Sequence, residues 1–265
     1  MKGQPASPQT DRGLVDLLYQ LADDELVIGH RASEWTGVAP HIEEDVAFSS
    51  IAQDEVSHAA LFYRLLADLG EGGGDPDRIA FGRPPEAFRN AILLEQLNGD
   101  WADEIARHFL YSEYEAVLLP RLERSPHRPL AEAARLIARE ESYHRAHFRR
   151  WLERLAQAGG EARGRIQRSL RRAYWLAAGL FEPGPAEEET VRWRGCSIDD
   201  LRKEWDQAVI RYCAALDLVL PTGSPGVPDE VPDPLGGRRG VHSPAMRALV
   251  DELTQVYRLD PSATW

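Results

Sequence analysis

Apolar residues recur every three or four positions through most of the chain, which is the period of an amphipathic α-helix. Gly and Pro interrupt this pattern at a few points, such as the Gly72–Gly74 run and Gly159-Gly160. Because these residues favour turns, they mark the ends of the predicted helices. We expect four long helical stretches at about 11–35, 41–69, 86–124 (loosened at Asn98-Gly99) and 129–158.

The four long stretches predict two helical hairpins, and two hairpins favour a four-helix bundle. Beyond the bundle we expect helices at about 161–181 and 197–219, a Pro/Gly-rich loop at 221–241 and a terminal helix at 244–258. Ser197 is the expected N-cap of the second of these helices. No linker precedes residue 221, so the predicted organisation is one all-α domain over 1–265, with its core bundle at about 11–158.

Each long helix carries a glutamate where its apolar stripe requires a core residue. These positions are Glu25, Glu55 with His58, Glu113, and Glu141 with His144. A carboxylate buried without a partner costs several kcal/mol or becomes protonated. Four helices with the same anomaly near mid-length suggest a common cause, and a bound cluster of cations supplies one. The alternative is a set of buried acid–histidine pairs that hold the bundle together.

The spacing of these residues forms an internal repeat. Glu55-x-x-His58 and Glu141-x-x-His144 each place a carboxylate and an imidazole one turn apart on one helix face. Glu25 precedes the first motif by 30 residues, and Glu113 precedes the second by 28. Ferritin-like proteins with a di-iron or di-manganese centre use this ligand set. Carboxylates and imidazoles suit iron, with manganese as the alternative, better than zinc.

Two acids next to the motifs are candidates for orienting the histidines. Asp54 and Glu140 immediately precede Glu55 and Glu141. An acid that hydrogen-bonds the outer nitrogen of a ligand histidine fixes its tautomer. The alternative is that both are solvated helix acids.

Composition and charge exclude several functions. The chain has 43 acidic against 31 basic residues, a formal charge of −12, which disfavours nucleic-acid binding. No stretch approaches the roughly 18 apolar residues of a membrane-spanning helix. Two cysteines, Cys196 and Cys213, are too few for a disulfide framework. We expect a soluble cytoplasmic protein.

Basic residues gather in two places after the bundle. A solvated surface is the simplest interpretation, and contact with a partner protein or a CoA phosphate is the alternative. The candidates are Arg163, Arg168, Arg171 and Arg172 on one helix, and Arg238 and Arg239 in a Gly-rich loop.

Several stretches resemble the phenylacetate-catabolism family, the ferritin-like subunits of the multicomponent phenylacetyl-CoA epoxidase. They are 26–35, 95–107, 151–155 and 240–265, of which Asn98-Gly-Asp-Trp-Ala102 and the tail are the most particular. The chain is more similar to the C subunit than to the catalytic A subunit. The resemblance implies a ferritin-like fold, a di-iron centre, a homologous partner subunit or self-association, a reductase component, and an aromatic CoA thioester as substrate.

In that family the A subunit binds the di-iron centre and epoxidises the ring, whereas C subunits serve as scaffolds and commonly have degraded ligand positions. This chain retains all six. The predicted function is therefore a component of a di-iron oxygenase in phenylacetate catabolism. The alternatives are a non-catalytic scaffold for a homologous catalytic subunit, or else a ferroxidase or peroxide-handling ferritin relative.

Overall fold

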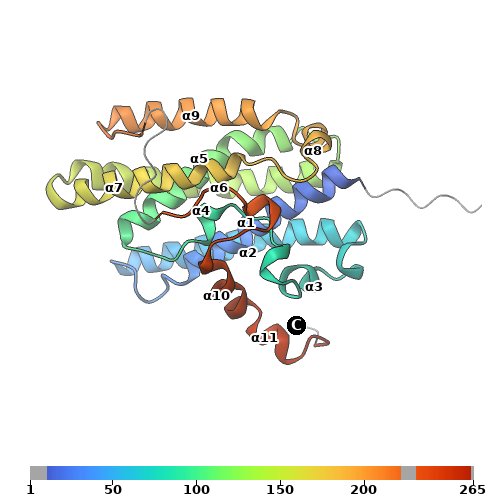
Figure 1. Ribbon diagram of the computed structural model, residues 1–265. Coiled ribbons are helices and arrows are strands. Elements are labelled where there is room, and N and C mark those ends of the chain that lie inside the picture. Colours follow the sequence, from blue (N-terminus) through green and yellow to red (C-terminus); the bar gives the residue numbers. More distant parts are fainter. Residues whose placement is uncertain (1–10, 222–230, 264–265) are drawn as a thin grey trace, which may run out of the picture.

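The computed structural model describes residues 11–221 and 231–263, and within these ranges the chain forms helices and no strands (Figure 1). The α-helices are α1 (Arg12–Ser33), α2 (Ile42–Asp68), α3 (Pro76–Phe81), α4 (Ile92–Glu95), α5 (Trp101–Leu122), α6 (Arg128–Gln157), α7 (Gly160–Leu176), α8 (Glu187–Arg194), α9 (Ile198–Ala215), α10 (Pro244–Leu253) and α11 (Gln255–Leu259). The 3-10 helices are η1 (Glu71–Gly73), η2 (Pro85–Ala87), η3 (Ala177–Phe181) and η4 (Gly237–Arg239).

Two helical hairpins form the central bundle. Helix α1 packs along α2, and α5 packs along α6. Helices α7 and α9 cover α5 on the side away from α2, and α8 packs against α1. In Figure 1, α9 lies along one edge of the molecule while α10 and α11 project from the opposite edge. This arrangement confirms the predicted all-α, ferritin-like bundle with additional C-terminal helices.

Polar side chains begin several of these helices at the residues that the sequence indicates. The Asp11 carboxylate accepts hydrogen bonds from the backbone N–H groups of Gly13 and Leu14 at the start of α1. Asp100 forms a capping box with Asp103 at the start of α5. Ser197 caps α9 as predicted, because its hydroxyl accepts from the N–H of Asp200. These bonds satisfy N–H groups that have no partner within the helix.

The prediction of a helical stretch from residue 86 was wrong for residues 86–100. That segment consists of the end of η2, the single turn α4 and extended connections. Its backbone bonds instead to acids of α1. Helices α3 and α8 were not predicted, and the predicted terminal helix divides at Thr254 into α10 and α11. Part of the predicted 221–241 loop, residues 222–230, lies outside the described residues.

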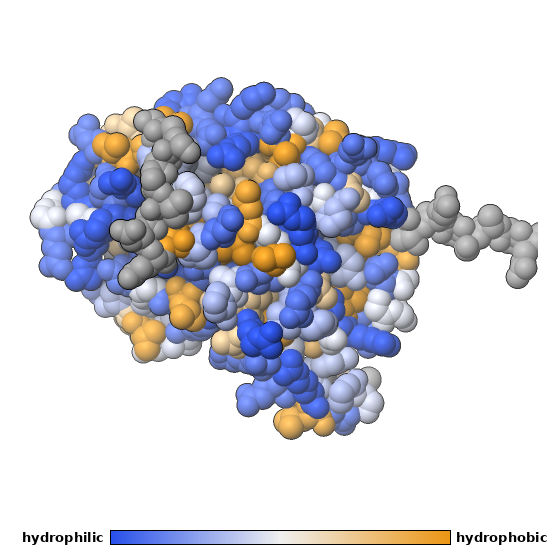
Figure 2. Space-filling model, viewed as in Figure 1, coloured by the Kyte–Doolittle hydropathy of each residue, from blue (hydrophilic) through white to orange (hydrophobic). Residues whose placement is uncertain are grey.

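The buried apolar side chains form one contiguous core. On the face shown in Figure 2 hydrophilic residues predominate, and apolar residues occur there only in small groups. None of the helices in residues 11–221 and 231–263 combines the length and apolar character that crossing a bilayer requires. One domain over 1–265 stays a prediction.

Candidate metal centre

Helices α1, α2 and α6 bring five of the predicted residues together in the bundle core. Glu25 comes from α1, Glu55 and His58 from α2, and Glu141 and His144 from α6, each no more than 4% exposed. They form two groups, Glu25–Glu55–His58 and Glu55–Glu141–His144, whose potential ligand atoms lie within 4.8 Å of one another. Glu55 belongs to both groups and therefore lies between them.

The two histidines face this cluster with their Nδ1 atoms. His58 Nδ1 lies 3.6 Å from Glu25 Oε2, 3.6 Å from Glu55 Oε2 and 3.7 Å from Glu141 Oε1. His144 Nδ1 lies 2.7 Å from Glu141 Oε1 and 3.6 Å from Glu55 Oε1. The carboxylates and the inward nitrogens thus converge on a common space.

The outer nitrogens of the histidines pair crosswise between α2 and α6. His58 Nε2 lies 2.7 Å from Glu140 Oε2, and His144 Nε2 lies 3.1 Å from Asp54 Oδ2. Each acid therefore contacts the histidine of the opposite helix. Because each outer acid holds a proton on Nε2, loss of the Nδ1 proton would leave a lone pair directed into the cluster.

Glu113 does not face the cluster, which corrects its predicted position. Its buried carboxylate accepts hydrogen bonds from the guanidinium groups of Arg145 (2.9 and 2.8 Å) and Arg149 (2.5 and 2.8 Å). One turn earlier, Phe109 packs against Tyr212 of α9, with ring centroids 5.6 Å apart. Helix α5 is buried on opposite faces, and Glu113 lies on the face turned toward α9.

Glu115 occupies the side of α5 that faces the cluster. It is 2% exposed, and its pKa is raised well above the usual value by burial and by the nearby charges of Glu141 and Glu25. The sequence pattern did not reveal it, because its stripe on α5 includes polar Glu104 and His108 and is less typical of a core face. The sequence does contain a signal that favours Glu115 over Glu113. Arg145 and Arg149 lie one turn apart on α6 and can both pair with Glu113, which leaves Glu115 as the carboxylate without a cationic partner.

Burial and charge shift the pKa values of this cluster strongly. Burial and the neighbouring Glu55 raise the pKa of Glu25 well above its usual value. Burial opposes ionisation of Glu55 too, but its contacts with Glu25 and the two histidines hold its pKa well below the usual value. Burial disfavours charge on both histidines, yet adjacent carboxylates raise the pKa of His58 to about 12 and that of His144 to about 11. Without cations, protons therefore balance the buried carboxylates.

The donor set fits a pair of cations. Five polar atoms of the cluster are buried without a hydrogen-bond partner: Glu25 Oε2, Glu55 Oε2, His58 Nδ1, Glu115 Oε2 and Glu141 Oε2. Buried polar atoms are nearly always paired, so a concentration of unpaired ones in one place indicates a missing ligand. Carboxylate oxygens with two imidazoles match the preferences of iron and manganese.

Two acids that precede Glu25 fix this part of α1 to the rest of the fold. Asp24 accepts from the backbone N–H of Ala91 at 2.8 Å and pairs with both terminal nitrogens of Arg238 at 2.8 Å. Asp23 accepts from the N–H of Arg89 at 2.7 Å and also binds Arg83. The segment that was wrongly predicted as helix thus holds the helix that carries Glu25.

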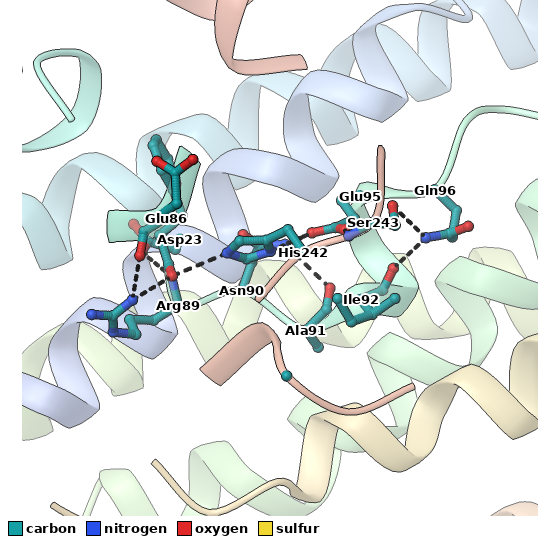
Figure 3. Close-up of polar contacts among 12 residues, drawn as sticks. Asp23, Glu86, Arg89, Asn90, Ala91, Ile92, Glu95, Gln96, His242 and Ser243 are labelled. Carbon is teal, nitrogen blue, oxygen red and sulfur yellow. Dashed lines mark hydrogen bonds and ion pairs between the residues drawn. The ribbon is translucent and has the colours of Figure 1, made fainter. Parts of the chain in front are cut away.

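The C-terminal segment is attached through the same region (Figure 3). Buried Glu95 lies 2.7 Å from His242 Nδ1, and it accepts from the N–H of Ser243 at 2.6 Å and from the Asn90 side chain at 2.9 Å. Gln96 adds a contact of 3.2 Å to the Ser243 hydroxyl. Residues 242–243 therefore bind the segment after η2, far from them in sequence.

The predicted basic contact residues lie in different environments. Arg238 is only 1% exposed and is paired inside the fold, which corrects its assignment as a contact for CoA or a partner. Arg163 donates to the carbonyl groups of Ala156 (2.8 Å) and Asp217 (2.7 Å), and Arg239 pairs with Glu182 at 2.7 Å.

The remaining three, Arg168, Arg171 and Arg172, are exposed along α7. Arg172 also lines a cavity of about 40 Å³ beside Gln96, Gly99 and Arg107. For these three residues, contact with a partner protein or a CoA phosphate stays a prediction.

The helical bundle and the carboxylate–histidine cluster in its core define a ferritin-like protein with a candidate dimetal centre. The family described as phenylacetic acid catabolic protein matches residues 2–265, and the chain belongs to that family.

Two relatives from Escherichia coli K12 are components of one enzyme, 1,2-phenylacetyl-CoA epoxidase. The chain is 31% identical over 250 residues to the C subunit of that enzyme, covering 93% of this chain and 96% of the relative. It is 23% identical over 215 residues to the A subunit, covering 78% of this chain and 68% of the relative.

Proposed function

We propose that this chain is a component of a multicomponent di-iron oxygenase that epoxidises phenylacetyl-CoA or a similar aromatic CoA thioester. The observation that carries the proposal is the set of unpaired, buried ligand atoms in a member of this family. The proposed ligands are Glu25, Glu55, His58, Glu115, Glu141 and His144. Glu115 thus takes the place that was predicted for Glu113.

The glutamate side chains have different proposed roles in holding such a pair of ions. Glu55 would serve both ions, because it belongs to both candidate groups, and Glu141 would hold an ion beside it together with His144. Bound iron would supply dioxygen activation and transfer of one oxygen atom to the ring. Manganese is the alternative metal, since it accepts the same donors. Glu25 and Glu115 hold protons in the metal-free cluster, and cation binding would displace these protons.

Asp54 and Glu140 orient the two imidazoles and connect the cluster to solvent. Their side chains are 40% and 42% exposed, whereas those of His58 and His144 are at most 5% exposed. Each acid holds the proton on an Nε2 atom, so the Nδ1 atoms stay available to metal. The core around the ligands excludes water and strengthens the electrostatic interactions there.

A homologous ferritin-like subunit is the proposed partner, because both similar E. coli proteins are components of the same enzyme. A reductase component and the CoA thioester complete the proposed system. Its proposed location is the cytoplasm, in keeping with two free cysteines. We do not favour a purely structural scaffold, because the cluster leaves several buried ligand atoms without a hydrogen-bond partner, which a set of structural ion pairs would satisfy.

The test combines the iron-loaded protein with a reductase, NADPH, phenylacetyl-CoA and a homologous partner of the A type. We expect dioxygen-dependent formation of a product that is heavier by one oxygen atom, detected by mass spectrometry. Glu115→Gln should abolish this increase, whereas Glu132→Gln, which changes an exposed glutamate of α6, should not. Equal product from wild type and Glu115→Gln would overturn the proposed role of this centre.

A further inference from the structure

A second group of side chains that can bind metal lies between α1 and the C-terminal helix α10, outside the core cluster. His30 and Glu34 lie one turn apart near the end of α1, and Glu252 lies near the end of α10. His30 Nε2 is 3.8 Å from Glu34 Oε1 and 3.8 Å from Glu252 Oε2. The three potential ligand atoms lie within 4.8 Å of one another.

The histidine of this group lacks the partner that a structural role would give it. His30 Nε2 is buried without a hydrogen-bond partner, although the side chain is 16% exposed. This Nε2 atom faces one carboxylate from the end of α1 and one from α10, and imidazole nitrogen with carboxylate oxygens is a donor set that zinc accepts.

The surroundings of Glu34 are those of a supported ligand. Arg31 donates to Glu34 Oε1 at 2.5 Å, and the Asn98 amide donates to Glu34 Oε2 at 2.9 Å. Such hydrogen bonds orient a ligating carboxylate, and each of its oxygens keeps a further lone pair. The carboxylate is therefore fixed on α1 before any ion arrives.

We propose that His30, Glu34 and Glu252 bind one divalent cation of the zinc type, which links α10 to α1. Zinc takes imidazole nitrogen and carboxylate oxygen at about 2.0–2.2 Å, so two ligands of a tetrahedral ion are about 3.4 Å apart. The two separations from His30 Nε2, 3.8 Å each, exceed this by about 0.4 Å. The Glu252 side chain, 64% exposed, can rotate to close its own separation, and a small shift of the His30 imidazole toward Glu34 would close the other. Three protein ligands leave the fourth position to water.

The site would extend the attachment of the C-terminal segment. Residues 242–243 are already fixed by Glu95, but α10 then projects from the bundle (Figure 1). An ion between Glu252 and α1 would hold the far end of α10 as well. This inference does not rest on the proposed oxygenase function, since none of its three residues belongs to the core cluster.

The test is a zinc titration of the chelator-treated full-length protein, followed with a competing chromophoric chelator. Zinc taken up by the core cluster is common to all variants, so the readout is the difference between them. We expect wild type to bind one zinc ion more than His30→Ala and Glu252→Gln. The controls are His41→Ala, an exposed histidine, and Asp251→Asn, the acidic neighbour of Glu252, and both should match wild type.

Hydrogen exchange gives an independent readout of the link. Zinc should slow exchange of the α10 amides at least tenfold in wild type and leave it unchanged in Glu252→Gln. Since Glu252 is exposed, this variant retains the fold even if His30→Ala does not. Equal zinc stoichiometry in wild type and Glu252→Gln, with no change in α10 exchange, would overturn the proposal.

Discussion

Two glutamates on α5, two residues apart, should have opposite effects on the stability of the metal-free protein. Glu113 is a fully buried carboxylate that neutralises Arg145 and Arg149. Glu115 is a buried carboxyl group whose pKa is raised well above its usual value of 4.5 by burial. Glu113→Gln removes a partner from two cations, whereas Glu115→Gln removes a group that must take up a proton on folding.

The structure sets the size of both effects. Removing one partner of a buried ion pair costs about 3–5 kcal/mol, but the two arginine side chains are 35% and 29% exposed. Water can therefore replace part of the lost interaction, and we expect Glu113→Gln to destabilise by about 2–3 kcal/mol. Protonating Glu115 costs about 1.4 kcal/mol for each pH unit above its ordinary pKa, so Glu115→Gln should stabilise by roughly 1–3 kcal/mol at pH 7.

Urea unfolding in the presence of a chelator, followed by far-ultraviolet circular dichroism, measures both free energies of unfolding. In excess iron, wild type should instead be more stable than Glu115→Gln, because ligand binding stabilises only the protein that has the site. The assignment would be refuted if Glu115→Gln destabilised the metal-free protein as much as Glu113→Gln. It would also be refuted if Glu113→Gln left stability unchanged and removed iron.

Three further predictions concern the groups around the cluster. The raised pKa values of His58 and His144, about 12 and 11, contribute stability that is complete below pH 6.5 and lost as pH rises toward 11. The free energy of unfolding of the metal-free protein, measured with urea, should therefore fall above pH 6.5, by up to about 2.7 kcal/mol per pH unit for the two histidines together. Asp54→Asn should weaken iron binding about 10–100-fold in a chelator competition assay, because it removes the carboxylate that orients His144. Arg238→Ala leaves Asp24 buried without its cation and should cost about 3–5 kcal/mol in chemical denaturation.

Sequence periodicity was sufficient where a helix has one buried face and one exposed face. Helices α2 and α6 are of this kind, and the predicted positions of Glu55, His58, Glu141 and His144 all lie in the core. A polar residue in such an apolar stripe has few interpretations other than a position in the core. The predicted boundaries of α1, α2 and α6 also agree with the structure, since turn residues end these helices.

Periodicity was insufficient where neighbours on several sides bury a segment. Helix α5 contacts α6, α7, α8 and α9, so it has two buried stripes, and the more apolar one contains Glu113 rather than Glu115. In residues 86–100 apolar side chains recur at 87–88, 91–94 and 97, a spacing that resembles a helix, but Asp23 and Asp24 of α1 bind the backbone of this segment. Those bonds depend on residues more than 60 positions away, and no local pattern reports them.

The most direct test of the metal centre is the iron content of protein reconstituted anaerobically with ferrous iron and desalted. Inductively coupled plasma mass spectrometry should find about two iron ions per wild-type chain. Glu55→Ala should retain fewer than one, because Glu55 belongs to both candidate groups. Folded Glu113→Gln should retain both. Wild type without iron, or Glu55→Ala with the full complement, would contradict the dimetal centre on which the proposed function depends.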